Sequence, residues 1–165
     1  MSRNYANICK PLSPRKAGSS DNQRMADVHN TETRRFNMSR VRGRHTRPEI
    51  TLRRLVFSLG YRYRLHDSRL PGKPDLVFAG RRKVIFMHGC FWHCHDCAKG
   101  KSTPARNEQF WKDKRAANVA RDARTIESLS TAGWATLVVW ECQLRDVEAL
   151  THRLVRFVGV RSHRK

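Results

Sequence analysis

A run of cysteines and histidines most constrains how this chain can fold. Cys90, His95 and Cys97 lie close together in the sequence, and Cys142 stands far along the chain. Thiolates and imidazoles are the ligands of tetrahedral zinc, so we expect a structural zinc site that ties a loop to a distant strand. Cys94 remains open, because it could be a spare ligand, a substitute for Cys90 or Cys97, or no ligand. A buried thiol is the plain alternative for any single cysteine.

The charge of the chain limits its partners. Lys and Arg number 34 against 14 Asp and Glu, which gives a formal net charge of +20. Such charge attracts polyanions, so DNA, RNA and an anionic membrane are the partners to consider. No apolar run approaches the roughly 20 residues of a membrane helix, and no apolar stretch near the N-terminus resembles a secretory signal. We therefore expect an intracellular protein that binds nucleic acid.

The N-terminal segment differs in composition from the remainder. Residues 1–24 are rich in Ser, Pro, Asn, Lys and Arg without apolar periodicity, and we expect a disordered basic extension. A chain of 165 residues usually forms one domain, so residues 25–165 are expected to fold as one unit. The segment 34–47 is rich in arginine and holds no acid, which favours phosphate contact over a merely solvated surface.

Apolar periodicity predicts a mixed α/β domain with one central sheet. A helix capped by Thr46 and ended by Gly60 comes first, and alternating residues at 61–65 indicate a strand. The remaining elements are strands at 75–79 and 83–88 joined by a turn at 80–82, a helix at 107–131, a strand at 134–140 and a final amphipathic helix carrying Val147, Leu150, Leu154, Phe157 and Val158.

A carboxylate stands at the start of one predicted strand. Asp75 follows Pro74, and Met87 and His88 end the next strand of the same hairpin. A carboxylate on a rigid strand suits Mg²⁺, which prefers oxygen ligands and retains water for chemistry. Glu49 on the first helix could supply a second oxygen through a bound water. Taken alone, Pro74–Asp75 is more typical of a turn that caps a strand.

Two further histidines lie near the cysteines once His95 is assigned to zinc. His88 and His93 follow the strand that pairs with Asp75, and either could exchange a proton with water or with a leaving oxygen. Asp122 on the later helix is a candidate to orient the catalytic base. A phosphate contact or a surface position is the equally weighted alternative for each histidine.

Aromatic residues accompany the cysteine and histidine loop. Phe91 and Trp92 have little apolar sequence around them, which slightly favours insertion between bases over core packing. Trp111 lies beside Phe110 and among basic residues, and core packing and base contact are equally weighted for it.

Five separated segments together resemble one enzyme family. They are LPGKPDLVF, VIFMHGCFWHCHDC, NEQFW, NVARD and WATLVVWEC, in this order. The chain from about Met25 to Leu150 resembles the very short patch repair (Vsr) DNA mismatch endonucleases. This resemblance implies a restriction-endonuclease-like fold, with a central mixed sheet flanked by helices. The usual Glu-x-Lys half of that superfamily's site is absent, and Met87 and nearby histidines stand in its place, as the Vsr branch leads us to expect.

The resemblance also implies roles for individual residues. Asp75 and the backbone carbonyl of Met87 would bind magnesium, Glu49 would hold a metal-bound water, and His93 would activate the attacking water. Orientation of His93 would come from Asp122, and His88 would assist near the scissile phosphate. The implied zinc ligands are Cys90, His95, Cys97 and Cys142, with Cys94 a non-ligand. The implied DNA contacts are Phe91, Trp92 and Trp111 as a wedge from the major groove, Met38 from the minor groove and Lys114 beside the mismatch.

The implied reaction is hydrolysis of one strand 5′ to the thymine of a T:G mismatch, which arises when 5-methylcytosine deaminates. Double-stranded DNA would be the partner of a monomeric enzyme in the bacterial cytoplasm, at the nucleoid, with mismatch-repair proteins as candidate further partners. One alternative is a zinc-stabilised DNA-binding module without nuclease activity. Only the enzyme requires Glu49, Asp75 and His93 together. Another alternative, a double-strand restriction nuclease, is disfavoured by the missing Glu-x-Lys and by the aromatic residues.

Overall fold

A three-stranded mixed sheet forms the centre of the molecule. In the computed structural model, which describes residues 44–105 and 107–159, the strands are β1 (Leu76–Phe78), β2 (Lys83–His88) and β3 (Ala135–Trp140). Their order is β1-β2-β3, with β1 antiparallel to β2 and β2 parallel to β3. The predicted mixed α/β architecture is therefore confirmed, with a central mixed sheet and flanking helices.

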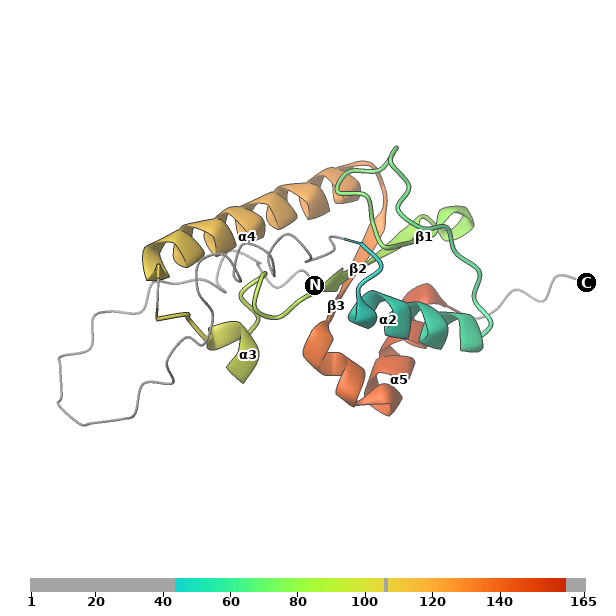
Figure 1. Ribbon diagram of the computed structural model, residues 1–165. Coiled ribbons are helices and arrows are strands. Elements are labelled where there is room, and N and C mark those ends of the chain that lie inside the picture. Colours follow the sequence, from blue (N-terminus) through green and yellow to red (C-terminus); the bar gives the residue numbers. More distant parts are fainter. Residues whose placement is uncertain (1–43, 106, 160–165) are drawn as a thin grey trace, which may run out of the picture.

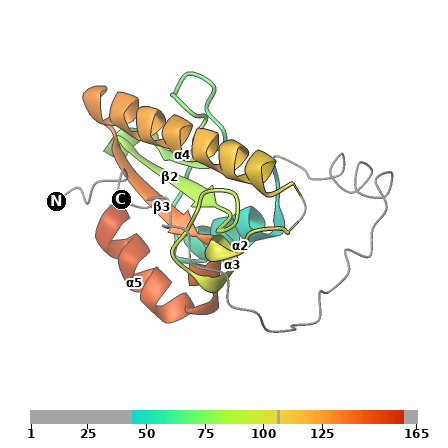
Figure 2. The same ribbon diagram turned by 90° about the vertical axis from the view of Figure 1, so that its left-hand side faces the viewer.

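Helices cover both faces of this sheet (Figures 1 and 2). The long helix α4 (Glu108–Thr131) lies on one face, and α2 (Arg47–Ser58) and α5 (Val147–Val158) lie on the other. Alternate strand residues point to the two faces, as a period of two requires. Ile85 and Val139 pack with α2 and α5, whereas Val84 and Val138 join the cluster on the α4 side.

Local sequence signals fix the ends of the helices. The Thr46 hydroxyl accepts a hydrogen bond from the backbone N–H of Glu49 at the start of α2, and the Asp146 carboxylate caps α5 in the same way through the N–H of Ala149. Gly133 follows α4 with φ +74, a conformation that glycine adopts without strain. Two short elements were not predicted, namely α3 (Ala98–Lys101) and the 3₁₀ turn η3 (Glu141–Arg145), whereas the 3₁₀ turn η2 (Ala79–Arg81) overlaps the turn predicted at 80–82.

The predicted strand at 61–65 is wrong. Only Arg64 pairs with a strand, through two backbone hydrogen bonds of 2.9 and 2.8 Å with Val77. Tyr61 and Tyr63 still face the same way, because both rings meet Phe78 edge-on. The pairing goes no further: His66 has a positive φ of +47, and its N–H bonds to the carbonyl of Pro74, ahead of β1. The alternating sequence pattern at 61–65 thus correctly indicated which side chains share a face, but it did not indicate continuous strand pairing.

The final helix differs from its prediction at one residue. Leu150, Leu154 and Val158 of α5 are buried, as expected, but Val147 is 52% exposed because it begins the helix beyond the edge of the core. Among the described residues, no helix is long and apolar enough to cross a membrane. The predicted extension at 1–24, Met38 and most of the arginine-rich segment 34–47 lie outside the described residues.

Candidate active site

Asp75 lies directly before β1 and is fixed from β2. Its Oδ2 accepts a hydrogen bond of 2.7 Å from the backbone N–H of Met87, so the hairpin itself orients the carboxylate. Asp75 faces a hollow of about 470 Å³, which brings together the predicted residues from three elements and two loops. The ionisable residues that line this hollow include Glu49, His66, Asp75, His88, His93 and Asp122.

Burial leaves the Asp75 carboxylate poorly compensated by the protein. Loss of water, together with nearby Glu49, raises its pKa from an ordinary 3.8 to about 6, which outweighs the opposite effect of the Met87 N–H. A buried carboxylate beside a second acid is a favourable environment for a divalent cation, because the cation supplies the missing positive charge. The donor set on this side of the hollow therefore fits a hard metal ion.

Glu49 is held in place within the first turn of α2. Its carboxylate accepts hydrogen bonds from the Thr46 hydroxyl at 3.1 Å, from the backbone N–H of His45 at 2.9 Å and from Arg53 at 2.8 Å. Thr46 and Glu49 thus contact each other twice, because the backbone N–H of Glu49 also donates to the Thr46 hydroxyl at 3.4 Å. Glu49 is buried, and its orientation toward the hollow is set by these contacts.

His93, His88 and Asp122 form a second group on the opposite wall. Nδ1 of His93 is hydrogen-bonded to the Asp122 carboxylate, and the ring of His88 stacks on that of His93 with centroids 3.9 Å apart. Asp122 lies on α4, and both histidines come from the end of β2 and the loop after it. The predicted pairing of His93 with Asp122 is therefore present in the structure.

His88 is a neutral imidazole in this environment. Burial lowers its pKa to about 3, and the neighbouring His93 lowers it further, although Asp122 acts in the opposite direction. Its Nδ1 lies 4.0 Å from the Asp122 carboxylate and is buried without a hydrogen-bond partner among the described residues. The neutral His88 ring stacks on His93 and can form one hydrogen bond with a bound group through Nδ1. It offers no positive charge to a phosphate.

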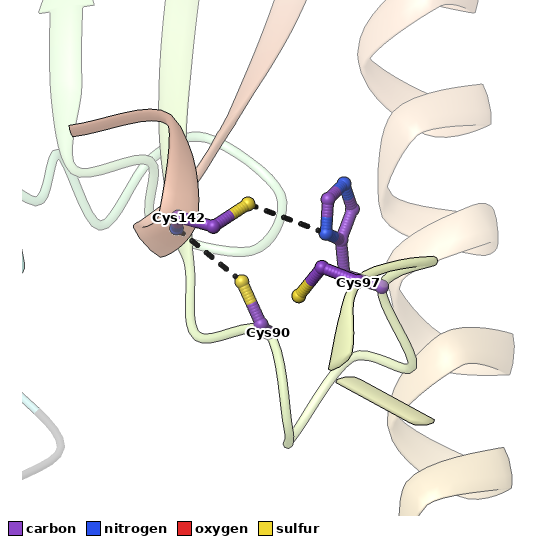
Figure 3. Close-up of side chains that lie close together, drawn as sticks. Cys90, Cys97 and Cys142 are labelled. Carbon is purple, nitrogen blue, oxygen red and sulfur yellow. Dashed lines mark hydrogen bonds between the residues drawn. The ribbon is translucent and has the colours of Figure 1, made fainter. Parts of the chain in front are cut away.

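The cysteines and His95 converge beyond the end of β2 (Figure 3). Sulfur atoms of Cys90, Cys97 and Cys142 and a ring nitrogen of His95 all lie within 4.8 Å of one another. The Sγ of Cys142 is 3.4 Å from Nδ1 of His95, and the backbone N–H of Cys142 donates to Sγ of Cys90 at 3.4 Å. Burial raises the pKa of the Cys90 thiol, whereas a hydrogen bond with His95 lowers that of Cys97.

Three thiols and one imidazole at this spacing can hold a soft divalent metal. Cys94 adopts a positive φ of +54 in the same loop and is not one of the four clustered residues. This placement resolves the alternative that the sequence left open, since the four residues brought together are those that the resemblance implied. The cluster joins the loop after β2 to the turn after β3.

The aromatic residues form one partly exposed cluster next to this loop. The ring of Trp111, near the start of α4, lies 5.8 Å from that of Phe91 and 5.7 Å from that of Trp92. The ammonium of Lys114 lies 5.7 Å from the Trp92 ring, and the Arg115 guanidinium lies 4.9 Å from the Phe91 ring. The cluster is therefore an aromatic surface with positive charge against it, which suits contact with nucleic acid.

The sequence analysis did not predict Arg53, which contacts two residues of the hollow, or His66, which lines it. Arg53 bonds to Glu49 at a spacing of four on α2, a spacing that could have indicated the pair. His66 comes from the segment after Arg64 and lies 3.8 Å from Oδ1 of Asp75. Its neighbours come from α2 and from the start of β1, so no local pattern marks it as part of the site.

Comparisons with known proteins identify the relatives of this chain. Residues 26–99 match the family described as DNA mismatch endonuclease Vsr. The type II nicking enzyme V.XorIIP of Xanthomonas oryzae is 48% identical over 130 residues, which cover 79% of this chain and 95% of the relative. The DNA mismatch endonuclease Vsr of Escherichia coli is 47% identical over 127 residues, which cover 77% of this chain and 81% of the relative. The resemblance inferred from sequence motifs is thus confirmed, and the chain belongs to the Vsr family of DNA mismatch endonucleases.

Proposed function

We propose that this DNA mismatch endonuclease hydrolyses one phosphodiester bond 5′ to the thymine of a T:G mismatch, with magnesium as its cofactor. The observation that supports this most is the meeting of Asp75 and the His93–Asp122 pair across one hollow. A carboxylate that can hold a hard cation, and an imidazole oriented by a second carboxylate, are what hydrolysis of a phosphodiester requires.

Asp75 and the backbone carbonyl of Met87 would hold the magnesium ion. When bound, the ion would stabilise charge that develops on the phosphate and would lower the pKa of water. The Asp122 carboxylate accepts the hydrogen of His93 Nδ1, so Nε2 of His93 carries a lone pair that can take a proton from the attacking water. Glu49, fixed by Arg53 and Thr46, would orient water on the other side of the hollow.

The aromatic cluster would recognise the mismatch. Phe91, Trp92 and Trp111 would enter the stack from the major-groove side, and Lys114 would contact a base beside the mismatch. A T:G wobble pair is held less well than a matched pair, so separating it from its neighbours requires less energy. The same insertion would open the backbone near Asp75.

Zinc would make the recognition loop rigid. Cys90, His95, Cys97 and Cys142 supply four soft ligands, which leaves no open position for catalysis and favours a structural role. Because these ligands come from the loop after β2 and the turn after β3, zinc would link the aromatic loop to the sheet. Phe91 and Trp92 lie within the segment that the ligands bracket.

The wider architecture follows the same proposal. We assign the sheet and its helices to a restriction-endonuclease-like fold, in one domain that spans 25–165 after a basic extension at 1–24. Met38 and the arginine-rich segment 34–47 would contact the DNA from the minor-groove side. The enzyme would act on double-stranded DNA as a monomer, with mismatch-repair proteins as further partners.

A strand-specific nicking assay tests the proposed function. Duplexes labelled on either strand, with T:G, T:A, C:G and other pairs at one position and varied flanking sequence, are incubated with the chain and Mg²⁺. We expect a single nick 5′ to the mismatched thymine and no cut in the other strand. Equal cutting of matched duplexes, or breaks in both strands, would contradict the proposal. Binding without cutting would favour the DNA-binding module instead.

A further inference from the structure

The buried guanidinium of Arg53 contacts two residues that line the hollow, Glu49 and His66. Arg53 on α2 has one nitrogen, NH2, at 2.8 Å from Glu49 Oε2 and at 2.8 Å from His66 Nε2. Its other terminal nitrogen, NH1, lies 2.8 Å from Nδ1 of His45. Arg53 is only 8% exposed, so these contacts form away from bulk water. Glu49 and His66 are therefore both positioned by the same side chain.

The contact with Arg53 determines which nitrogen of His66 carries the hydrogen. A guanidinium only donates hydrogen bonds and stays protonated, so Nε2 of His66 must accept. The ring hydrogen is then on Nδ1, and this atom lies 3.8 Å from Oδ1 of Asp75. The N–H of Met87 holds the other oxygen of the same carboxylate at 2.7 Å.

The same contact argues against a metal at this corner of the hollow. Glu49, His66 and Asp75 are ligand types whose atoms lie within 4.8 Å of one another. However, the lone pair of His66 Nε2 faces Arg53, and Nδ1 is protonated, so the imidazole has no lone pair for a cation. The guanidinium occupies the position that a cation between Glu49 and His66 would need.

We propose that Arg53 is a positioning residue, which holds His66 as the tautomer that points its Nδ1–H at Asp75. This inference rests on the proposed role of Asp75 in hydrolysis. At 3.8 Å the two atoms are too far apart for a direct hydrogen bond, and one water molecule about 2.8 Å from both would join them. Asp75 would then be oriented on one oxygen by Met87 and on the other by His66, as outer-shell groups orient metal ligands elsewhere.

Nitrogen NMR of the ¹⁵N-labelled full-length chain reads the tautomer directly. Long-range proton–nitrogen correlations distinguish the protonated from the unprotonated ring nitrogen, and the spectrum of His66→Asn identifies which of the eight histidines is His66. At pH 7.5 we expect Nδ1–H and an unprotonated Nε2. An Nε2–H tautomer or a doubly protonated ring in the unsubstituted chain would overturn the proposal. This spectrum tests the tautomer even where substitution of Arg53 impairs folding.

Substitutions on α2 provide the matched comparison. Arg53→Met removes the donors but keeps much of the side-chain length, and we expect the two His66 tautomers to interchange. Arg54→Gln changes the exposed arginine next in sequence and should leave the Nδ1–H tautomer intact. If Arg53→Met folds and His66 stays locked as Nδ1–H, Arg53 is not the positioning group.

Single-turnover nicking of a T:G duplex tests the consequence for the reaction. His66→Leu removes the donor and should lower the rate constant about 10- to 100-fold, the range found for outer-shell partners, with the Kd for the duplex unchanged. His66→Asn puts an amide N–H near the position of Nδ1 and should restore the rate to within a few-fold. Equal losses in the two variants would overturn the proposal. Because the tautomer is read without DNA, a chain that fails to nick at all would count against the proposed function alone.

Discussion

The carboxylate of Asp75 is shaped by two opposing requirements. The backbone N–H of Met87 on β2 orients the carboxylate, whereas burial and the proximity of Glu49 make its ionised form unfavourable. In a folded protein without magnesium, this charge is a destabilising feature. Such a feature is typical of sites that are built for a ligand, because the charge that weakens the fold is the one that binds the cation.

Replacement of Asp75 by Asn should therefore stabilise the metal-free site at alkaline pH. The pKa of Asp75 is raised from 3.8 to about 6 in the folded chain, so the folded state binds the proton more tightly and loses stability as pH rises through about 6. A shift of this size corresponds to on the order of 3 kcal/mol. Chemical denaturation without added Mg²⁺ should show Asp75→Asn more stable than the parent at pH 8 and equal to it near pH 3.5.

Asp67→Asn is the matched control for this pH dependence. A hydrogen bond from Arg69 lowers the pKa of Asp67 to about 2, so its ionised form stabilises the fold above the ordinary pKa and the effect is lost as pH falls toward 2. Asp67→Asn should consequently weaken the fold at pH 8, the opposite sign to Asp75→Asn. If both substitutions shift the denaturation midpoint in the same direction at pH 8, the electrostatic account of Asp75 is wrong.

His93 and Asp122 should behave as one functional unit. His93→Ala should lower the single-turnover rate constant about 10²- to 10⁴-fold, the range for loss of a general base. Asp122→Asn should cause most of the same loss, and the double variant should be no worse than the poorer single one, since both substitutions disable the same proton acceptor, His93. Asp113→Asn, an exposed acid on the same helix, is the control. If the losses in rate constant add in the double variant, His93 and Asp122 act independently.

Residue chemistry was easier to infer from sequence than residue contacts. Asp75, His93 and Asp122 were expected at the site because their types suit hydrolysis and their motifs resemble a known family, and the structure lines one hollow with them. His66 and Arg53 were missed because their contact joins a helix to an irregular segment, where no period in the sequence marks a pairing. The neutrality of His88 follows from burial, which a strand-end position does not reveal.

At the scale of elements, the loop after β2 combines two tasks. It contributes Cys90, His95 and Cys97 to the Cys/His cluster and carries Phe91 and Trp92 between them. The cluster joins this loop to η3 through Cys142, so the aromatic rings are held by groups that are far apart in the sequence. Rigid support favours insertion, because a mobile loop would lose conformational entropy when it becomes ordered against the DNA.

Loss of one cluster cysteine should distinguish a metal site from packed thiols. We expect one zinc per chain by atomic emission, and Cys142→Ser should reduce bound zinc and lower the thermal midpoint by more than about 5 °C. Cys94→Ser, in the same loop but outside the cluster, should leave both quantities unchanged. A chain that holds no zinc, or equal effects of the two substitutions, would contradict a structural zinc site.

The wedge predicts a loss of discrimination rather than of general affinity. Trp92→Ala should reduce the ratio of nicking rates on T:G and T:A duplexes at least about tenfold, since stacking is worth about 1–3 kcal/mol per base. Total binding should fall less, because phosphate contacts remain. Phe57→Ala, which removes another exposed aromatic ring with a guanidinium 4.3 Å away, is the control. An unchanged ratio for Trp92→Ala would exclude the wedge.

Elements with strong local signals were predicted well. Helix α2 carries Thr46 and Pro48 at its start, and β2 and β3 are apolar runs of the expected length. The strand predicted at 61–65 was wrong because continuous pairing also depends on the backbone that follows. There His66 has a positive φ, which no pattern in the sequence indicates. The short helix α3 and the turn η3 were missed because α3 follows Cys97 and η3 contains Cys142, two members of the Cys/His cluster, where tertiary contacts and not propensity set the backbone.

For the whole molecule, the formal charge of +20 sets the strength of DNA binding. Contacts with phosphates release counterions, so raising the salt concentration from 50 to 200 mM should weaken duplex binding by roughly 10³-fold or more. The preference for T:G over T:A duplexes should change little, because base contacts carry it. Fluorescence anisotropy over a salt series measures both. Affinity that is insensitive to salt would contradict a mainly electrostatic contact.

In the proposed mechanism Asp75 holds the magnesium ion for hydrolysis, whereas other groups bind the DNA. Single-turnover nicking of a T:G duplex by Asp75→Asn, with the Kd measured on the same preparation, separates these two roles. We expect nicking to be lost while the Kd stays within about threefold, since one carboxylate contributes little to binding dominated by phosphate contacts. If Asp75→Asn nicks at the rate of the unsubstituted chain, Asp75 does not hold a catalytic metal.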